Sequence, residues 1–452
     1  MSGGRAPVSH VLVGPALAAA IGLAATAWGV FSPAVLEFYA DSPDSVGIAR
    51  WAERATAQDM LRWWTGTWIQ ADSYYYRPLA SFLFWLECRL FGYDFQGHVV
   101  ISWLLHGAVC VCVYMLALRL FPRRHALSPA TALLAVALVN VRLGPSGPHW
   151  QEAPVAYSVV AWWPAQTDQA SLLLSLLALL ALDRWLQGED RRGLATASVL
   201  WVAAVLFKEM ALILPAIIGI LLVMRRGWGA LRLLSRAEHG ALRIAPGLAW
   251  RVVLPPIVAA AVFLAARPLI VPGAWAGVES PARGYLLKVV FLLFARPFTI
   301  LVSHGAWLPL TAAFIALGTY LWLRLPRRPS VVWLTLALVL GSGAIAQLVG
   351  GNFALLTIPT QLGALGTVTL LALGLLALAH VRAGWVWGLL GMALVVHVPL
   401  ISVWGPHYFY WPAAFWALFN AGLWHWVIVG AGEQGLIGGR ATVDSMEAPI
   451  IT

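Results

Sequence analysis

Charged residues are scarce in this sequence: Asp, Glu, Lys and Arg make up 11% of 452 residues, against 61% hydrophobic residues. An ordinary soluble domain carries about 25% charged residues, so the composition excludes that class and predicts a polytopic membrane protein. The first uncharged run, from Val11 to Phe31, has 21 residues. As a helix it is about 31 Å long, enough to cross a bilayer, and it is too long for a cleaved signal core. We expect a retained anchor.

Cysteine and lysine are also rare. Cys88, Cys110 and Cys112 are the only cysteines, and they lie in apolar segments without CxxC spacing. This excludes a disulfide framework and a cysteine zinc site, and predicts packing roles. Lys208 and Lys288 are the only lysines, so the net charge of +10 comes from arginine. The arginines cluster at the ends of apolar runs, which indicates membrane topology and no nucleic-acid partner.

The arginine clusters predict about twelve transmembrane helices with both termini in the cytoplasm. The domain spans residues 1–432, with a first outer loop at 33–97, a cytoplasmic arginine-rich loop at 225–251 and a short cytoplasmic tail at 433–452. The expected spans are 10–32, 98–120, 127–143, 167–187, 193–207, 209–224, 252–271, 306–324, 330–350, 361–380, 384–403 and 412–430. Segments 78–92 and 285–302 do not fit this alternation and are expected to be juxtamembrane or partly inserted helices on the outer face.

The first outer loop is acidic and rich in aromatic residues. Ala57, Leu61, Trp64 and Trp68 have helical spacing. A helix here would lay an apolar stripe on the bilayer surface, with Asp59 and Arg62 turned away. Trp and Tyr also gather at membrane interfaces for amphipathic reasons alone, so the aromatic residues by themselves indicate no site.

Ionisable residues inside the apolar part of the chain point to function more strongly. Lys208 and Glu209 interrupt an apolar stretch from Leu194 to Met224 and are expected at the outer turn of a helical hairpin. A cavity-facing site and a simple ion pair are both open for them. His98 and His106 lie two turns apart on one helix face, where ligand contact and helix-to-helix hydrogen bonding are equally open.

Five segments carry a family resemblance: FYADSPDS at 38–45, YYRPLASFLFWLECRLFGYDFQGHVVISWLLH at 75–106, WWPAQTDQASLLLSLLALLAL at 162–182, LFKEMALILP at 206–215 and HYFYWP at 407–412. Their order resembles the GT-C superfamily of integral-membrane glycosyltransferases. Within it, the order resembles the protein O-mannosyltransferase-like group that includes the tetratricopeptide-linked O-mannosyltransferases. The chain departs from that group where Ser42 and Pro43 separate two acids that are often adjacent, and at Ser102 and Gln166, where relatives often have Asn and Arg. No repeat domain is expected after Gly430.

The resemblance implies a GT-C type helix bundle that transfers a sugar from a polyprenyl-phosphate donor to an acceptor hydroxyl, with inversion at the sugar. Asp41 is the implied general base, and Arg77 with Lys208 or His407 would neutralise the lipid phosphate. Asp168 and Glu209 would orient these cations or bind sugar hydroxyls. The other implied substrate-binding residues are Asp44, Tyr76, His98, His106 and Tyr408. A divalent metal, Mg²⁺ or Mn²⁺, between Asp41 and a second carboxylate stays open.

Two other classes are weighed against this one. A transporter or lipid flippase would show symmetric halves, and no such repeat is evident. A polysaccharide polymerase or ligase would place its catalytic residues in a large late outer loop, whereas the longest outer loops here come early. The sugar stays open, as does the class of acceptor: protein, lipid or glycan. We expect a bacterial plasma membrane, with the active site on its periplasmic or extracellular face.

Overall fold

The computed structural model describes residues 9–70, 75–122, 127–140, 159–227, 235–236, 242–243, 252–271, 384–396, 398–399 and 410–433. This part is helical except for two short antiparallel strands, β1 (Ser235–Arg236) and β2 (Leu242–Arg243). The all-α prediction is therefore confirmed for the described residues. The predicted helices at 285–302, 306–324, 330–350 and 361–380 lie outside them.

The longer helices coincide with the predicted apolar spans. They are α1 (Ser9–Val30), α6 (Phe95–Leu120), α7 (Ser128–Val139), α9 (Gln166–Leu186), α10 (Gly193–Phe207), α11 (Leu214–Arg226), α13 (Leu254–Ile270), α19 (Gly384–Val395) and α20 (Tyr410–Glu433). Within the described ranges, two helices, Phe95–Leu120 and Trp163–Leu186, are long and apolar enough to cross a membrane, and several others are apolar but shorter. The structure thus fits membrane association, while the number of crossings stays a prediction.

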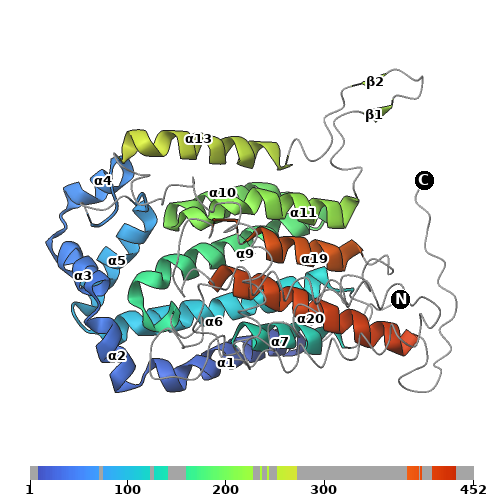
Figure 1. Ribbon diagram of the computed structural model, residues 1–452, viewed down its shortest axis with the longest axis horizontal. Coiled ribbons are helices and arrows are strands. Elements are labelled where there is room, and N and C mark those ends of the chain that lie inside the picture. The colour runs from blue at the N-terminus through green and yellow to red at the C-terminus, as the bar shows by residue number, and fades with distance from the viewer. Residues whose placement is uncertain are drawn as a thin grey trace, which may run out of the picture.

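Four short helices fold the first outer loop: α2 (Pro33–Ala40), α3 (Pro43–Arg54), α4 (Ala57–Thr65) and α5 (Pro78–Phe91). Three of them begin with proline, whose fixed φ suits the first helical position. Figure 1 shows all four gathered at one end of the longer helices, with β1 and β2 of the arginine-rich segment at the opposite end. The four first-loop helices and the β1–β2 pair therefore lie at opposite ends of the bundle, while the assignment of these ends to the outer and cytoplasmic sides stays a prediction.

The predicted Trp-rich stripe of α4 is wrong at Trp68. The helix ends at Thr65 because Gly66 adopts an extended conformation, so Trp68 lies beyond it. Trp68 is buried and packs edge-to-face on Phe84 of α5. Leu61 and Trp64 do form an exposed apolar face.

Close packing of α6 against α1 relies on small residues. A Cβ at Gly107 would lie 2.9 Å from Leu23, and one at Gly22 would lie 2.5 Å from Cys110. Cys110 and Cys112 are buried in the core, and Cys88 is half-buried. All three cysteines are free, and the burial of Cys110 and Cys112 fits the predicted packing role.

Helices α10 and α11 form a hairpin along α9. The first residue of α10, Gly193, lies against Trp185 near the end of α9, and Arg226 at the end of α11 donates to the Leu186 carbonyl. The turn between α10 and α11 contains Lys208, whose side chain contacts Asp168 at the start of α9. The predicted turn at Lys208 and Glu209 is confirmed, and it lies at the first-loop end of the bundle.

A buried charged cluster as the candidate functional site

Two arginines meet on one carboxylate at the first-loop end of the bundle. Arg77 donates from Nε and Nη2 to Glu209 Oε2, at 3.1 and 3.0 Å. Arg267, near the end of α13, places Nη2 3.3 Å from Glu209 Oε1. Residues from α5, the α10–α11 turn and α13 thus converge on one point, and we call this group, together with Lys208 and Asp168, the outer cluster.

The second ion pair of the outer cluster joins Lys208 to α9. Lys208 Nζ lies 2.5 Å from Asp168 Oδ2, and both side chains are almost fully buried. The extended backbone of Lys208, at φ −160°, ends α10 and aims the side chain at α9. Ser171 Oγ donates to the Ala204 carbonyl at 2.9 Å, which holds the end of α10 against α9.

Aromatic residues enclose Arg77. Its guanidinium lies 4.0 Å from the ring centroid of Tyr75 and 5.3 Å from that of Trp68. Such cation–π contacts hold a planar cation without neutralising it. Tyr76 is buried and donates from its hydroxyl to the Trp64 carbonyl at 3.1 Å. Burial raises the pKa of Tyr76, so it stays a neutral donor.

The described part of the outer cluster contains three cations and two carboxylates, all largely buried. Asp168 Oδ1 is buried and accepts no hydrogen bond, and neither polar atom of the neighbouring Gln169 side chain has a partner. Buried polar atoms without partners are costly unless a ligand or water satisfies them. The excess of cations suits a phosphate. Among the described residues, no three His, Cys, Asp or Glu side chains are grouped as a metal site.

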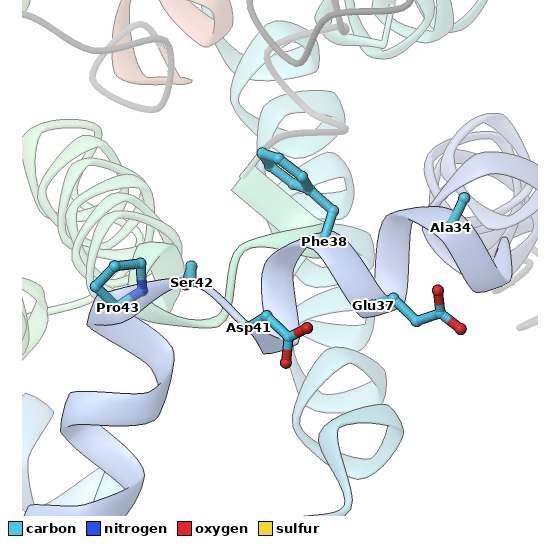
Figure 2. Close-up of a pocket in the computed structure, with 6 residues that line it drawn as sticks. All are labelled: Ala34, Glu37, Phe38, Asp41, Ser42 and Pro43. Carbon is cyan, nitrogen blue, oxygen red and sulfur yellow. The ribbon is translucent and has the colours of Figure 1, made fainter.

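Asp41 and Asp44 lie apart from the outer cluster. Asp41 follows α2, is exposed, and lines a pocket with Ala34, Glu37, Phe38, Ser42 and Pro43. Figure 2 shows Glu37 and Asp41 on the same side of α2, one turn apart, with Phe38 on the other side. In Figure 1, α2 and α13 lie at opposite edges of the molecule. The structure thus brings together Arg77, Asp168, Lys208 and Glu209, but neither Asp41 nor Asp44 joins them.

His98 bonds protein groups with both ring nitrogens. Nδ1 lies 3.1 Å from Glu87 Oε2, and Nε2 lies 3.1 Å from the Gly92 carbonyl oxygen. Trp163 stacks on the imidazole at 4.1 Å and donates from Nε1 to Glu87 Oε2 at 2.8 Å. Burial raises the pKa of Glu87, and the bonds from His98 and Trp163 oppose that shift. His98 is therefore an internal hydrogen-bonding residue in this structure.

His106 also uses both ring nitrogens in hydrogen bonds to residues of other elements. Its Nδ1 lies 2.6 Å from the Tyr410 hydroxyl of α20, and its Nε2 lies 2.8 Å from Asn140 Oδ1 after α7. His106 has no exposed surface. For both histidines the structure favours helix-to-helix bonding over ligand contact. His407 and Tyr408 lie outside the described residues.

Sequence reasoning missed three residues of these sites. Arg267 was read as part of an apolar span, although it is the only ionisable residue between 252 and 271. Neither Glu87 nor Glu37 is among the residues that the sequence predicts for the site. An isolated charge in an apolar run is a signal that could have identified Arg267.

Comparison of the chain with protein-family models, with curated proteins and with solved structures finds no match.

Proposed function

We propose that the protein is a GT-C-like membrane glycosyltransferase of about twelve spans, and that the outer cluster binds the phosphate of a polyprenyl-phosphate-linked sugar. The observation that carries the proposal is the convergence of Arg77, Arg267 and Lys208 with only two carboxylates, at the end where the first-loop helices gather. Arginine and lysine are the side chains that bind phosphate in proteins.

The two carboxylates fit the role of orienting the cations. Glu209 holds both guanidiniums, and Asp168 holds Lys208 through Oδ2, so the cations are positioned before a ligand arrives. Preorganised cations stabilise the charge that develops on a leaving phosphate in the transition state. The second Asp168 oxygen is left to accept a hydrogen bond from a sugar hydroxyl.

In the proposed reaction the acceptor oxygen attacks the anomeric carbon. The bond from that carbon to the phosphate oxygen breaks, its electron pair stays on the phosphate, and the acceptor proton moves to Asp41. Asp41 is exposed and lines the α2 pocket, so an acceptor from the outer aqueous phase can reach it. Because a base must lie within hydrogen-bond reach of its substrate, this mechanism requires α2 to approach the outer cluster in the substrate-bound state.

The test is transfer of radiolabelled sugar from a panel of polyprenyl-phosphate sugars by the full chain in lipid. We expect Asp41→Asn to lower the transfer rate by about 10²- to 10⁴-fold, the usual contribution of a general base. The matched control is Asp94→Asn, which keeps an oxygen to cap α6 at Gln96 N. Full transfer by Asp41→Asn would move the base to Asp44 or Asp168. Donor binding without turnover by the wild type would favour a flippase.

A further inference from the structure

One buried carboxylate oxygen joins α5, α6 and the turn before α9. Glu87 Oε2 of α5 contacts His98 Nδ1 of α6 at 3.1 Å and accepts from Trp163 Nε1, in the turn before α9, at 2.8 Å. All three residues are at most 2% exposed. The role of these residues is not explained by the proposed chemistry, because none of them belongs to the outer cluster.

The hydrogen bonds of Glu87 and His98 determine how many protons the two side chains carry. The Gly92 carbonyl can only accept, so His98 Nε2 must carry a proton. The bond between Nδ1 and Glu87 Oε2 then needs one further proton, on either the imidazole or the carboxyl group. Both arrangements leave Oε2 able to accept from Trp163. One shared proton therefore satisfies both nitrogens of His98 and Oε2 of Glu87, while Glu87 Oε1 is buried and accepts no hydrogen bond.

The surroundings of the pair are free of competing charges among the described residues. Arg89 of α5 donates to the Ala55 carbonyl, Glu53 of α3 accepts from Tyr93, and Asp94 caps α6. The half-buried Cys88 thiol has a pKa raised to about 12 by burial and so stays neutral. On the α9 side, Gln166 donates to the His98 carbonyl and to Ser102 Oγ, both at 3.0 Å.

We propose that Glu87 and His98 are positioning residues that hold the start of α9 against α5 and thereby set the spacing between Arg77 and the Asp168–Lys208 pair. Arg77 begins α5 and Glu87 lies near its other end, about 15 Å along the helix axis. Trp163 precedes Asp168 by little more than one helical turn. The inference rests on the proposed phosphate site, because spacing matters only if a ligand bridges the cations.

Glu87→Gln is the informative substitution. An amide oxygen at the Oε2 position accepts from Trp163, but it then needs a proton on His98 Nδ1 and leaves an imidazolium without a counter-charge. An amide nitrogen there instead opposes the Trp163 N–H donor. The side chain of the variant can bond both His98 Nδ1 and Trp163 Nε1 only when His98 is protonated. Its loss of lipid-phosphate binding should therefore diminish in acid. A purely structural defect would not depend on pH in this way.

The experiment measures binding of undecaprenyl phosphate to the full chain in nanodiscs at about pH 8 and at about pH 5.5, with each variant compared with the wild type at the same pH. We expect Glu87→Gln to bind about tenfold more weakly at the higher pH and to recover most of that loss at the lower one. Glu53→Gln, the same change on an exposed carboxylate, should match the wild type. An equal loss at both pH values, or no loss, would overturn the proposal.

Two further measurements separate the possible failures. Trp163→Phe keeps the ring stack on His98 and removes one hydrogen bond to Glu87, so we expect it to bind the lipid phosphate about threefold more weakly at every pH. Unchanged binding would contradict the proposal that this bond holds α9 against α5. This variant tests the proposal even if Glu87→Gln does not fold. The thermal midpoint of Glu87→Gln should also rise in acid relative to that of the wild type. If the wild type bound no lipid phosphate, the proposed function would fail. The thermal midpoint of Glu87→Gln would still test whether Glu87 and His98 share a proton.

Discussion

The two ends of the bundle each bury a carboxylate among cations, but only one end satisfies it. At the end opposite the first loop, Asp183 Oδ1 accepts from Arg225 Nε at 2.6 Å. Its Oδ2 accepts from Gln187 at 2.6 Å and from Arg119 at 3.3 Å. In the outer cluster, Asp168 Oδ2 contacts Lys208 and Oδ1 has no partner. A buried carboxylate whose two oxygens both accept hydrogen bonds from protein groups does not need a ligand, whereas one with an unpartnered oxygen can accept a hydrogen bond from a ligand.

The arginines at the two ends of the bundle also differ in the groups that they contact. Arg225 donates to the Arg119 carbonyl at 2.7 Å and Arg226 to the Leu186 carbonyl, so both satisfy the last carbonyls of helices. Cations at helix C-termini are stabilised by the helix dipole. Arg77, at the start of a helix, stacks on Tyr75 and pairs with Glu209. We infer that the Asp183 cluster is a structural tie and that the outer cluster is a place for an anion.

The largest expected difference comes from removing one arginine at each end. Arg77→Gln should lower sugar transfer by about 10²- to 10³-fold, as the loss of a preorganised charge donor does elsewhere. Arg119→Gln removes the same charge from the Asp183 cluster and should leave transfer per folded molecule within about threefold. Transfer assays on both purified variants measure this. Equal losses would remove the functional distinction between the two ends.

A second difference concerns stability. Asp183→Asn leaves Arg225 without its carboxylate, while Arg119 keeps its ion pair with Glu189 at 2.8 Å. Because Asp183 is fully buried, we expect the free energy of unfolding to fall by about 3 kcal/mol. Asp190→Asn is the control, because asparagine keeps the oxygen that accepts from Arg192 N. Denaturant unfolding in detergent measures both. Loss of transfer at unchanged stability in Asp183→Asn would contradict a structural role.

Residues that interrupt apolar runs were predicted well. Lys208 and Glu209 stood out because a charge inside an apolar stretch is costly, and the structure pairs them with Asp168 and Arg77. Arg267 carries the same signal but lay near the end of a predicted span, where a snorkelling arginine is unremarkable. Its partner is 58 residues earlier in the chain. No spacing rule predicts such a pairing.

The sequence did not predict which groups the buried side chains contact. Helical spacing placed His98 and His106 on one face, but only tertiary structure shows that Glu87, Gly92, Tyr410 and Asn140 use their nitrogens. Spacing also extended α4 to Trp68, whereas the backbone at Gly66 ends it earlier. The role of Asp41 came from the family resemblance, and its separation from the outer cluster depends on how α2 packs, which the sequence does not encode locally.

The smallest expected effect is in α4, whose Trp64 carbonyl accepts from Tyr76, the residue before Arg77 of the outer cluster. Thr56 donates from its backbone and its hydroxyl to Asp59 Oδ2, and these bonds hold the pKa of Asp59 below its usual value. This stabilisation is present above the unfolded pKa of about 3.9 and is lost as the pH falls through the lowered folded value. Asp59→Asn should therefore cost about 1 kcal/mol at neutral pH and progressively less in acid. Amide-exchange protection of α4, with exposed Gln58→Ala as control, measures this. A deficit that persists undiminished in acid would mean that the charge of Asp59 does not stabilise the helix.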